Sequence, residues 1–305
     1  MKALLIGGSG FIGSHLVDAL IAAGHSVRTY DRSPERFRST PIGVEFIQGE
    51  FSDTAVLAEA LTGVDIVYHL LSSTVPATSN LDPVADINSN LINTVRLIAM
   101  MRDAAVRRMV FLSSGGTVYG LPRTDPVKED HVLQPITSYG IVKTAIEKYL
   151  HMEHHLHGLE YTVLRTSNPY GPRQGHGGVQ GVIGTYLWNY ARGEPLQLWG
   201  DGSVVRDFIF VGDLTSLCVK AAQNSKIGFF NAGSGQGHSI RAIIDEISAV
   251  VGNTIRPEIK PGRAIDVPRI VLDISKAKSA FNWYPKTPLQ TGIASSWKWV
   301  QERSR

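Results

Sequence analysis

The chain has 305 residues, of which 43% are apolar and 19% are charged, a composition typical of a soluble globular protein. Lys and Arg number 30 and Asp and Glu 27, so the formal charge of +3 is too small to favour nucleic acid as a partner. The lone cysteine, Cys218, excludes an intrachain disulfide and a zinc site built from cysteines. No apolar run approaches the ~18 residues of a membrane span and no targeting signal is visible, so we expect a cytoplasmic protein.

The first half of the chain alternates short runs of branched apolar residues with amphipathic stretches. Strands are predicted at 4–6, 27–30, 44–47, 66–70, 109–112 and 162–164. Helical stripes lie at 12–23, at 91–101, and on Ile141, Ala145 and Tyr149. This alternation predicts an α/β domain at 1–171 with a doubly wound parallel sheet, the Rossmann fold. The shorter, mixed elements of 172–305 predict a smaller α+β lobe that binds substrate, with some segments returning to the first domain.

A glycine-rich turn follows the first predicted strand and opens the first predicted helix. Gly7, Gly10 and Gly13 have the spacing Gly-x-x-Gly-x-x-Gly. Gly7 permits a tight turn, Gly10 lets a pyrophosphate approach the backbone, and Gly13 lets the helix pack on the sheet. In this context the turn predicts a dinucleotide site at the helix N-terminus.

Asp31 ends the second predicted strand, at about the distance from the last glycine that a dinucleotide fingerprint requires. Its carboxylate can accept hydrogen bonds from both ribose hydroxyls and repels a 2′-phosphate, which favours NAD over NADP. Arg32, Arg36 and Arg38 would suit that phosphate, so they favour NADP unless they belong to a solvated loop.

Tyr139 and Lys143 are four residues apart in a predicted helix, so their side chains share one face. An ammonium within ~4–6 Å of a phenol stabilises the phenolate and lowers the tyrosine pKa, and a cationic nicotinamide would lower it further. Tyr139 is therefore predicted to act as a general base near neutral pH. Alone, such a pair indicates a surface contact; after a dinucleotide turn, it indicates a catalytic site.

Longer motifs resemble one family. With the glycine turn, Asp31 and the Tyr139/Lys143 pair, the resemblance is carried by NLINT at 90–94, SSGGTVYG at 113–120, RTSNPYGPR at 165–173, LWGDGSVVRDFI at 198–209 and RAIDV at 263–267. The chain resembles the extended short-chain dehydrogenase/reductases of the NAD-dependent epimerase/dehydratase family, and among them the UDP-sugar 4-epimerases. The resemblance implies tightly bound NAD, a UDP-sugar substrate, and a homodimer formed through helices around 84–104 and 138–156.

The resemblance also assigns residues to the two ligands. It implies cofactor contacts from Gly7, Gly10, Phe11, Ile12, Gly13, Asp31, Arg32, Glu50, Phe51, Leu70, Leu71, Asn90, Ser113, Tyr139 and Lys143. It implies substrate contacts from Ser114, Thr117, Asn168, Gln197, Trp199, Arg206, Arg263 and Asp266. The two arginines would clamp the diphosphate, Asp266 would hold a ribose hydroxyl or order Arg263, and Trp199 would stack on the uracil.

One position departs from the family pattern. The family carries Ser or Thr three residues before Val118, where the sugar hydroxyl needs a partner, and this chain carries Gly115. Ser114 and Thr117 are the nearest hydroxyls. Residues 115 and 117 share a side of an extended chain, which favours Thr117 as the catalytic hydroxyl. If neither hydroxyl reaches the sugar, proton transfer falls to Tyr139 and water.

The same segment narrows the reaction that the resemblance implies. Dehydratases and decarboxylases of the family carry a carboxylate at 116 or 117, and other members carry a cysteine nearby, whereas this chain has Gly116 and Thr117. What remains is epimerisation at C4: Tyr139 takes the O4 proton, C4 gives a hydride to NAD, and the hydride returns to the other face of the rotated 4-keto sugar. Ile270, where bulk would gate N-acetyl groups, leaves UDP-glucose, UDP-galactose, their N-acetyl forms and uronic acids open.

Two other functions remain as alternatives. An NAD(P)-dependent reductase of the same fold would release its cofactor after each turnover. A non-catalytic cofactor-binding protein is suggested only by Gly115.

The histidines at 151, 154, 155 and 157 crowd one segment, but we expect them to form a solvated helix end and predict no metal site.

Overall fold

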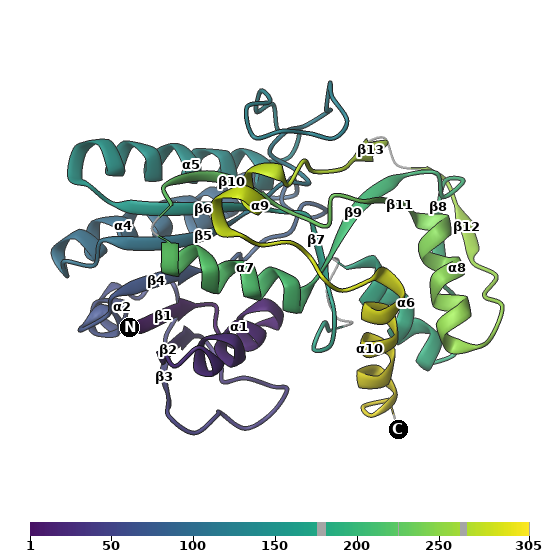
Figure 1. Cartoon of the computed structure of the whole chain (residues 1–305), viewed down its shortest axis with the longest axis horizontal. Coiled ribbons are helices and arrows are strands. Elements are labelled where there is room, and N and C mark those ends of the chain that lie inside the picture. The colour runs from purple at the N-terminus through teal and green to yellow at the C-terminus, as the bar shows by residue number, and fades with distance from the viewer. Residues whose placement is uncertain (176–180, 225, 263–266, 305) are drawn as a thin grey trace.

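The computed structural model describes residues 1–175, 181–224, 226–262 and 267–304. Its larger part is a seven-stranded sheet in the order β10-β6-β5-β4-β1-β2-β3, in which all neighbours are parallel (Figure 1). The strands are β1 (Lys2–Ile6), β2 (Ser26–Asp31), β3 (Val44–Gln48), β4 (Ile66–His69), β5 (Arg108–Ser114), β6 (Glu160–Thr166) and β10 (Gly228–Ala232). The predicted Rossmann sheet is confirmed.

Both faces of this sheet are covered by helices. Side chains of a strand alternate between the faces, so Ala3 and Leu5 of β1 enter one core cluster while Leu4 and Ile6 enter the other. The first cluster is covered by α1 (Phe11–Ala22), α7 (Val211–Asn224) and α9 (Ser275–Phe281), and the second by α2 (Thr54–Leu61), α4 (Asn93–Asp103) and α5 (Ser138–His157). Burial on both faces explains why the strands are continuous apolar runs rather than alternating ones.

The apolar stripe predicted on α5 does not face the core. Ile141 is 55% exposed and Tyr149 is 38% exposed, whereas Val142, Ile146 and Leu150 are buried against the sheet. The prediction of a helix is correct and its buried face is wrong, because the buried face also carries Lys143 and other polar residues that hide its apolar periodicity.

A second, smaller part of the molecule surrounds its own core cluster. It contains α6 (Val182–Ala191), α8 (Ile240–Val251) and α10 (Leu289–Gln301), with the strands β7 (Asn168–Tyr170), β8 (Gln197–Trp199), β9 (Val205–Phe210), β11 (Gly237–Ser239), β12 (Glu258–Lys260) and β13 (Arg269–Ile270). Strand β9 pairs with β7, β11 and β13, and β12 pairs with β8. In Figure 1 this lobe lies at the right, while α7, β10 and α9 return to the large sheet.

The order of the strands reverses beside β1, which has β4 on one side and β2 on the other. In open sheets of this kind, ligands bind outside the carboxyl ends of the strands at such a switch point. Between β4 and β5 the chain runs through α3 (Pro83–Asp86) and the π-helix η1 (Ile87–Ile92) into α4.

Among the helices in the described ranges, none has both the length and the apolar character of a membrane span.

Candidate functional site

A cavity of about 1110 Å³ lies at the carboxyl ends of β1, β4, β5 and β6. One wall comes from residues that follow these strands, and the other from the smaller lobe, including Trp199, Arg206 and Phe208. Single small-molecule sites usually measure about 300–1,000 Å³. The cavity is slightly larger than that range.

The glycine turn has the backbone geometry that a dinucleotide site requires. Gly7 has a φ of +85°, and a Cβ at Gly7 would lie 3.0 Å from the nitrogen of Leu71. A Cβ at Gly13 would lie 2.7 Å from Gly8 Cα, whereas a Cβ at Gly10 would make an ordinary contact, 3.4 Å from the carbonyl oxygen of Gly7. No side chain caps the first turn of α1. The turn thus fits a pyrophosphate lying against the helix N-terminus.

Asp31 lies at the end of β2, beside this turn. Its carboxylate accepts hydrogen bonds from the backbone N–H groups of Ser9 (3.2 Å) and Arg32 (2.8 Å). Burial raises the pKa of Asp31, and these two hydrogen bonds oppose the shift. Of the arginines that would suit NADP, Arg38 is bound to Asp18 at 2.5 Å and Arg36 lines the cavity. Arg32 extends into solvent.

The other predicted cofactor residues fall into two groups. Phe11, Ile12, Leu70 and Ser113 line the cavity. Glu50, Phe51, Leu71 and Asn90 support its walls: Glu50 accepts a hydrogen bond from Tyr30 on its carbonyl, Phe51 packs on His69, and Leu71 lies against the glycine turn. The amide of Asn90 is bonded to Ser73, Thr74 and Asp86, so in this structure it orders a loop.

Tyr139 and Lys143 share the buried side of α5, as their spacing predicts. Lys143 Nζ lies 5.6 Å from the centre of the Tyr139 ring and donates to the carbonyl of Leu112 at 3.0 Å. The predicted lowering of the phenol pKa is wrong for the cofactor-free protein. Burial, together with Asp86, raises the pKa of Tyr139 to about 12, and burial lowers that of Lys143 to about 8. Below pH 8 the Lys143 side chain therefore keeps its positive charge beside a neutral phenol.

The start of α5 is fixed by side chains that cap its first N–H groups. Thr137 accepts from Gly140, Asn80 accepts from Ser138, and Ser79 accepts from Tyr139. The loop at 72–80 is thereby fastened to the turn that carries Tyr139. Asn80 and Ser79 were missed in the sequence, because their contacts join segments about 60 residues apart.

A polar network, also missed in the sequence, continues along α5. Glu147 is fully buried, receives a hydrogen bond from Ser113 at 2.6 Å, and forms an ion pair with Arg165 at 2.8 Å. Its position four residues after Lys143 is the signal that would have placed it on the same face. Ser113, a predicted cofactor residue, is thus oriented by Glu147.

The segment at 113–120 places two residues with hydroxyl groups on the cavity wall. A Cβ at Gly115 would lie 2.6 Å from a methyl of Leu272 and 2.9 Å from the carbonyl oxygen of Arg165, so no side chain fits there. Ser114 and Thr117 both line the cavity. The Thr117 hydroxyl is buried and has no partner among the described residues. Such a group is available to a ligand.

The predicted substrate residues lie on the opposite wall. Asn168, Trp199 and Arg206 line the cavity. Arg206 is held by the carbonyl oxygens of Val205 (2.9 Å) and Val267 (2.5 Å). Gln197 is exposed, and its carbonyl accepts from Tyr186 at 2.7 Å; Ile270 lies in the core. Arg263 and Asp266 lie outside the described residues.

Aromatic residues from the smaller lobe and from the loop after β2 line part of the cavity. Trp299 of α10 meets Phe37 and Trp188 edge-on, with ring centres 6.1 and 5.8 Å apart, and Arg303 lies 4.6 Å above its ring. All four residues line the cavity. Trp299 thus contributes to the cavity wall, whereas Trp283 is buried in the core.

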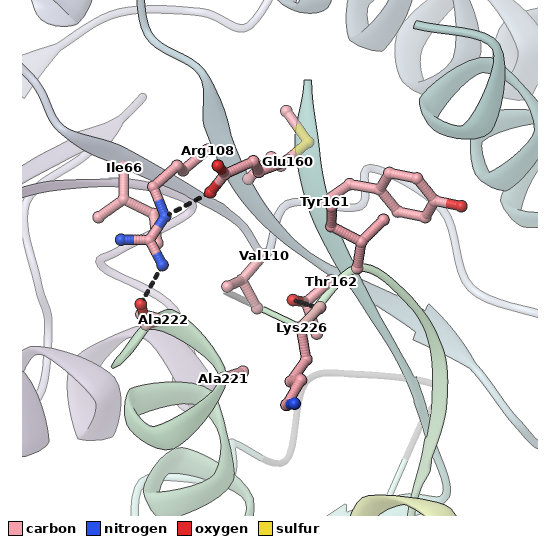
Figure 2. A pocket seen from close by; sticks show the side chains of 11 residues that line it. Ile66, Arg108, Val110, Glu160, Tyr161, Thr162, Ala221, Ala222 and Lys226 are labelled. Atoms are coloured by element: carbon pink, nitrogen blue, oxygen red, sulfur yellow. Dashed lines mark hydrogen bonds and ion pairs between the residues drawn. The ribbon is translucent and has the colours of Figure 1, made fainter. Parts of the chain in front are cut away.

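Two other features lie apart from the residues that line this cavity. His151 and His154 contact Tyr161, and no group of three or more potential metal ligands occurs in the described part of the chain. A pocket of about 10 Å³ lies at Arg108, which forms an ion pair with Glu160 at 3.3 Å and donates to the carbonyl of Ala222 (Figure 2). That volume admits about one water molecule.

Comparisons with known proteins agree with this geometry. The model of the NAD dependent epimerase/dehydratase family matches residues 3–233. A UDP-glucose 4-epimerase of Mycolicibacterium smegmatis is 34% identical over 313 residues and is covered completely, as is this chain. A putative UDP-glucose 4-epimerase of Methanocaldococcus jannaschii is also 34% identical, with 99% of each chain covered.

Solved structures with the same fold cover nearly the whole chain. A UDP-glucose 4-epimerase of Thermotoga maritima, with UDP-glucose, has a TM-score of 0.95 and 32% identity, and both chains are covered completely. A Thermus thermophilus UDP-glucose 4-epimerase, complexed with NAD, has a TM-score of 0.90 and 32% identity over 98% of this chain and 99% of that one. A UDP-N-acetylglucosamine 4-epimerase of Methanobrevibacter ruminantium has a TM-score of 0.93 and 27% identity over 99% and 98%.

Proposed function

The chain belongs to the NAD-dependent epimerase/dehydratase family, and we propose that it inverts the configuration at C4 of UDP-glucose and UDP-galactose with NAD as its cofactor. The observation that carries the proposal is the placement of Tyr139 and Lys143 on one wall of a cavity whose other wall offers Asn168 and Arg206. A proton acceptor thus faces a set of groups suited to a diphosphate.

The cofactor is held by the first wall. The turn at 7–13 receives the pyrophosphate, Asp31 binds the adenosine ribose, and Phe11, Ile12, Leu70 and Ser113 contact the rest. When bound, NAD supplies a hydride acceptor and donor at C4. Because the reaction has no net oxidation, nothing requires its release, and we propose that it stays bound.

The substrate is held by the second wall. Arg206, with Arg263, binds the diphosphate. Asp266 holds a ribose hydroxyl or orders Arg263, and Trp199, with Gln197 beside it, binds the uracil. Two backbone carbonyls hold the Arg206 guanidinium in place before substrate arrives. Tight binding of the nucleotide leaves the sugar ring free to rotate, so that either face of its C4 can be presented to the cofactor.

Proton transfer belongs to Tyr139, assisted by Thr117 with Ser114 beside it. The phenol needs a cationic environment to lower a pKa that stands at about 12 in the cofactor-free protein. Lys143 supplies one charge if it remains protonated. The Thr117 hydroxyl, buried without a partner among the described residues, orients the O4 hydroxyl.

The identity of the hexose is proposed from the names of the similar proteins. Two relatives that are 34% identical and cover this chain almost completely are named UDP-glucose 4-epimerase and putative UDP-glucose 4-epimerase, whereas the UDP-N-acetylglucosamine 4-epimerase is 27% identical. The test is an NMR screen of the purified protein with UDP-glucose, UDP-N-acetylglucosamine and UDP-glucuronic acid. Formation of UDP-galactose without added NAD supports the proposal. Consumption of a free keto compound with stoichiometric NAD(P)H would support a reductase instead.

We propose a homodimer with a cytoplasmic location. Apolar side chains on α3, η1 and α5 are exposed in the single chain: Val84, Ile87, Ile92, Ile141, Tyr149, Met152 and Leu156. Exposed apolar side chains on helices that contact one another favour a protein partner. The single cysteine suits a reducing compartment. Light scattering on the purified protein tests the dimer.

We also propose that 1–171 is the cofactor domain and 172–305 the substrate lobe.

A further inference from the structure

The loop after β2 is fastened to α1. Arg38 of this loop forms an ion pair with Asp18 at 2.5 Å and donates to the carbonyl of Ser14 at 3.2 Å. The loop directly follows Asp31, so these contacts hold it beside the glycine turn, where we propose that the dinucleotide binds. Its aromatic residue, Phe37, lines the cavity.

The C-terminal end of the smaller lobe reaches the same loop. Trp299 of α10 meets the Phe37 ring edge-on, with ring centres 6.1 Å apart. Arg303, one turn later, lies 4.6 Å above the Trp299 ring and makes a long hydrogen bond of 3.5 Å to the carbonyl of Phe37. On its other side Trp299 meets Trp188 of α6 at 5.8 Å, which holds the indole in the lobe. These contacts join Phe37 to a residue 266 positions later in the chain.

The joined segments also bring positive charge to the cavity. Arg36 of the loop and Arg303 both line it, on the side where Phe11 and Ile12 begin α1. A dinucleotide pyrophosphate is an anion, and guanidinium groups bind phosphate oxygens well. The charge of these segments therefore complements a cofactor held at the glycine turn.

We propose that Phe37, Trp299 and Arg303 form a latch that retains the dinucleotide. Opening of the ring contact would separate the loop after Asp31 from the smaller lobe and widen the cavity beside the cofactor, and its closure slows release. The smaller lobe thereby contributes to the cofactor site as well as to the substrate site. This inference rests on the proposed function, in which NAD stays bound through every turnover.

The test measures exchange of bound NAD for isotopically labelled NAD in the holoenzyme, followed by mass spectrometry of the cofactor released on denaturation. Phe37→Ala and Trp299→Ala each remove one ring of the contact, and we expect exchange to become about 10-fold faster in either variant. The double variant should show less than the product of the two effects, because both substitutions break the same contact.

Trp297→Ala is the matched control. Trp297 lies on the same helix, meets Tyr190 of the smaller lobe edge-on at 5.5 Å, and is not among the residues that line the cavity. Its loss should lower the Tm, as that of Trp299 does, and leave the exchange rate at the wild-type value. Phe37→Ala alters a loop rather than the core of the lobe, so it decides the question if Trp299→Ala does not fold.

Wild-type exchange rates in Phe37→Ala and Trp299→Ala, or an equal acceleration in Trp297→Ala, would overturn the proposal. Weaker binding of UDP with unchanged exchange of NAD would also overturn it, because the cluster would then belong to the substrate site; calorimetry with UDP gives that comparison. A wild-type protein that binds NAD but converts none of the UDP-sugars contradicts the proposed function instead, and the exchange rates still decide whether the latch exists.

Discussion

Asp18 on α1 forms an ion pair with Arg173, 2.9 Å long, that ties the large sheet's first helix to the segment leading into the smaller lobe. The second oxygen of Asp18 binds Arg38 at 2.5 Å, and His15, one turn earlier, lies 2.9 Å from the carbonyl of Pro172. One carboxylate thus joins three segments at the edge of the cavity.

Asp18→Asn should lower the free energy of unfolding modestly. The Asp18 side chain is 37% exposed and that of Arg173 18%, so solvent screens the pair, and we expect a loss of about 1 kcal/mol. Urea unfolding at low salt measures it, and the loss should shrink in 1 M NaCl. A double-mutant cycle with Arg173→Gln isolates the pair. A loss that is independent of salt would argue against an ionic contribution.

Tyr139→Phe should abolish turnover and leave NAD bound. A positioned acid–base group contributes about 10²–10⁴-fold to rate, and the phenol is the group on this wall that can exchange the O4 proton. Epimerisation is followed by NMR, and bound cofactor is measured after denaturing the purified protein. Equal NAD content in the variant and wild type separates a catalytic loss from a binding loss. Full activity in the variant would show that the base is another residue.

Thr117→Val should lower kcat by about 10–100-fold while changing stability little. The hydroxyl that is removed is buried and makes no hydrogen bond to a described residue, so the folded protein loses no partner. Ser114→Ala is the matched control and should have the smaller effect. If the order is reversed, Ser114 is the hydroxyl that orients the sugar.

Gly115→Ser should destabilise the protein and restore no activity. The new Cβ would meet Leu272 and the carbonyl of Arg165 at 2.6 and 2.9 Å, and such overpacking costs about 1–3 kcal/mol. Gly116→Ser is the control, because a Cβ there meets nothing within 4 Å. Thermal unfolding of both variants gives the comparison. A stable and more active Gly115→Ser protein would mean that Leu272 can move aside.

Local patterns predicted the parts of the site that lie within one segment. The glycine turn, Asp31 after β2, and the four-residue spacing of Tyr139 and Lys143 each depend on neighbours in sequence, and the structure places them as expected. The electrostatics of the pair depend on how deeply it is buried, which no spacing reveals. The sign of the Tyr139 shift was therefore predicted incorrectly.

Long-range contacts were the other features that the sequence could not supply. Asp86 meets Ser138 across the chain, and Trp299 reaches the cavity beside Phe37 because α10 packs near the loop after β2. Asp86 lies in a short helix whose other residues are exposed, and Trp299 lies near the C-terminus. From the sequence alone, neither residue is distinguished from an ordinary surface or packing residue. Only the packing of distant elements gives them a place at the site.

Lys143→Met should stabilise the cofactor-free protein at neutral pH and inactivate it. The pKa of Lys143 falls from 10.5 in the unfolded chain to about 8 in the folded one, so the folded state pays a penalty for the charged form. This penalty is fully present below pH 8 and disappears as the pH rises to about 10.5, because the unfolded chain then also loses the proton. At 1.36 kcal/mol per pKa unit, the variant gains up to about 3 kcal/mol below pH 8. Unfolding temperatures of both proteins between pH 6 and 10.5 should therefore converge at the alkaline end, and a gap that is constant with pH would show that packing, not charge, separates them.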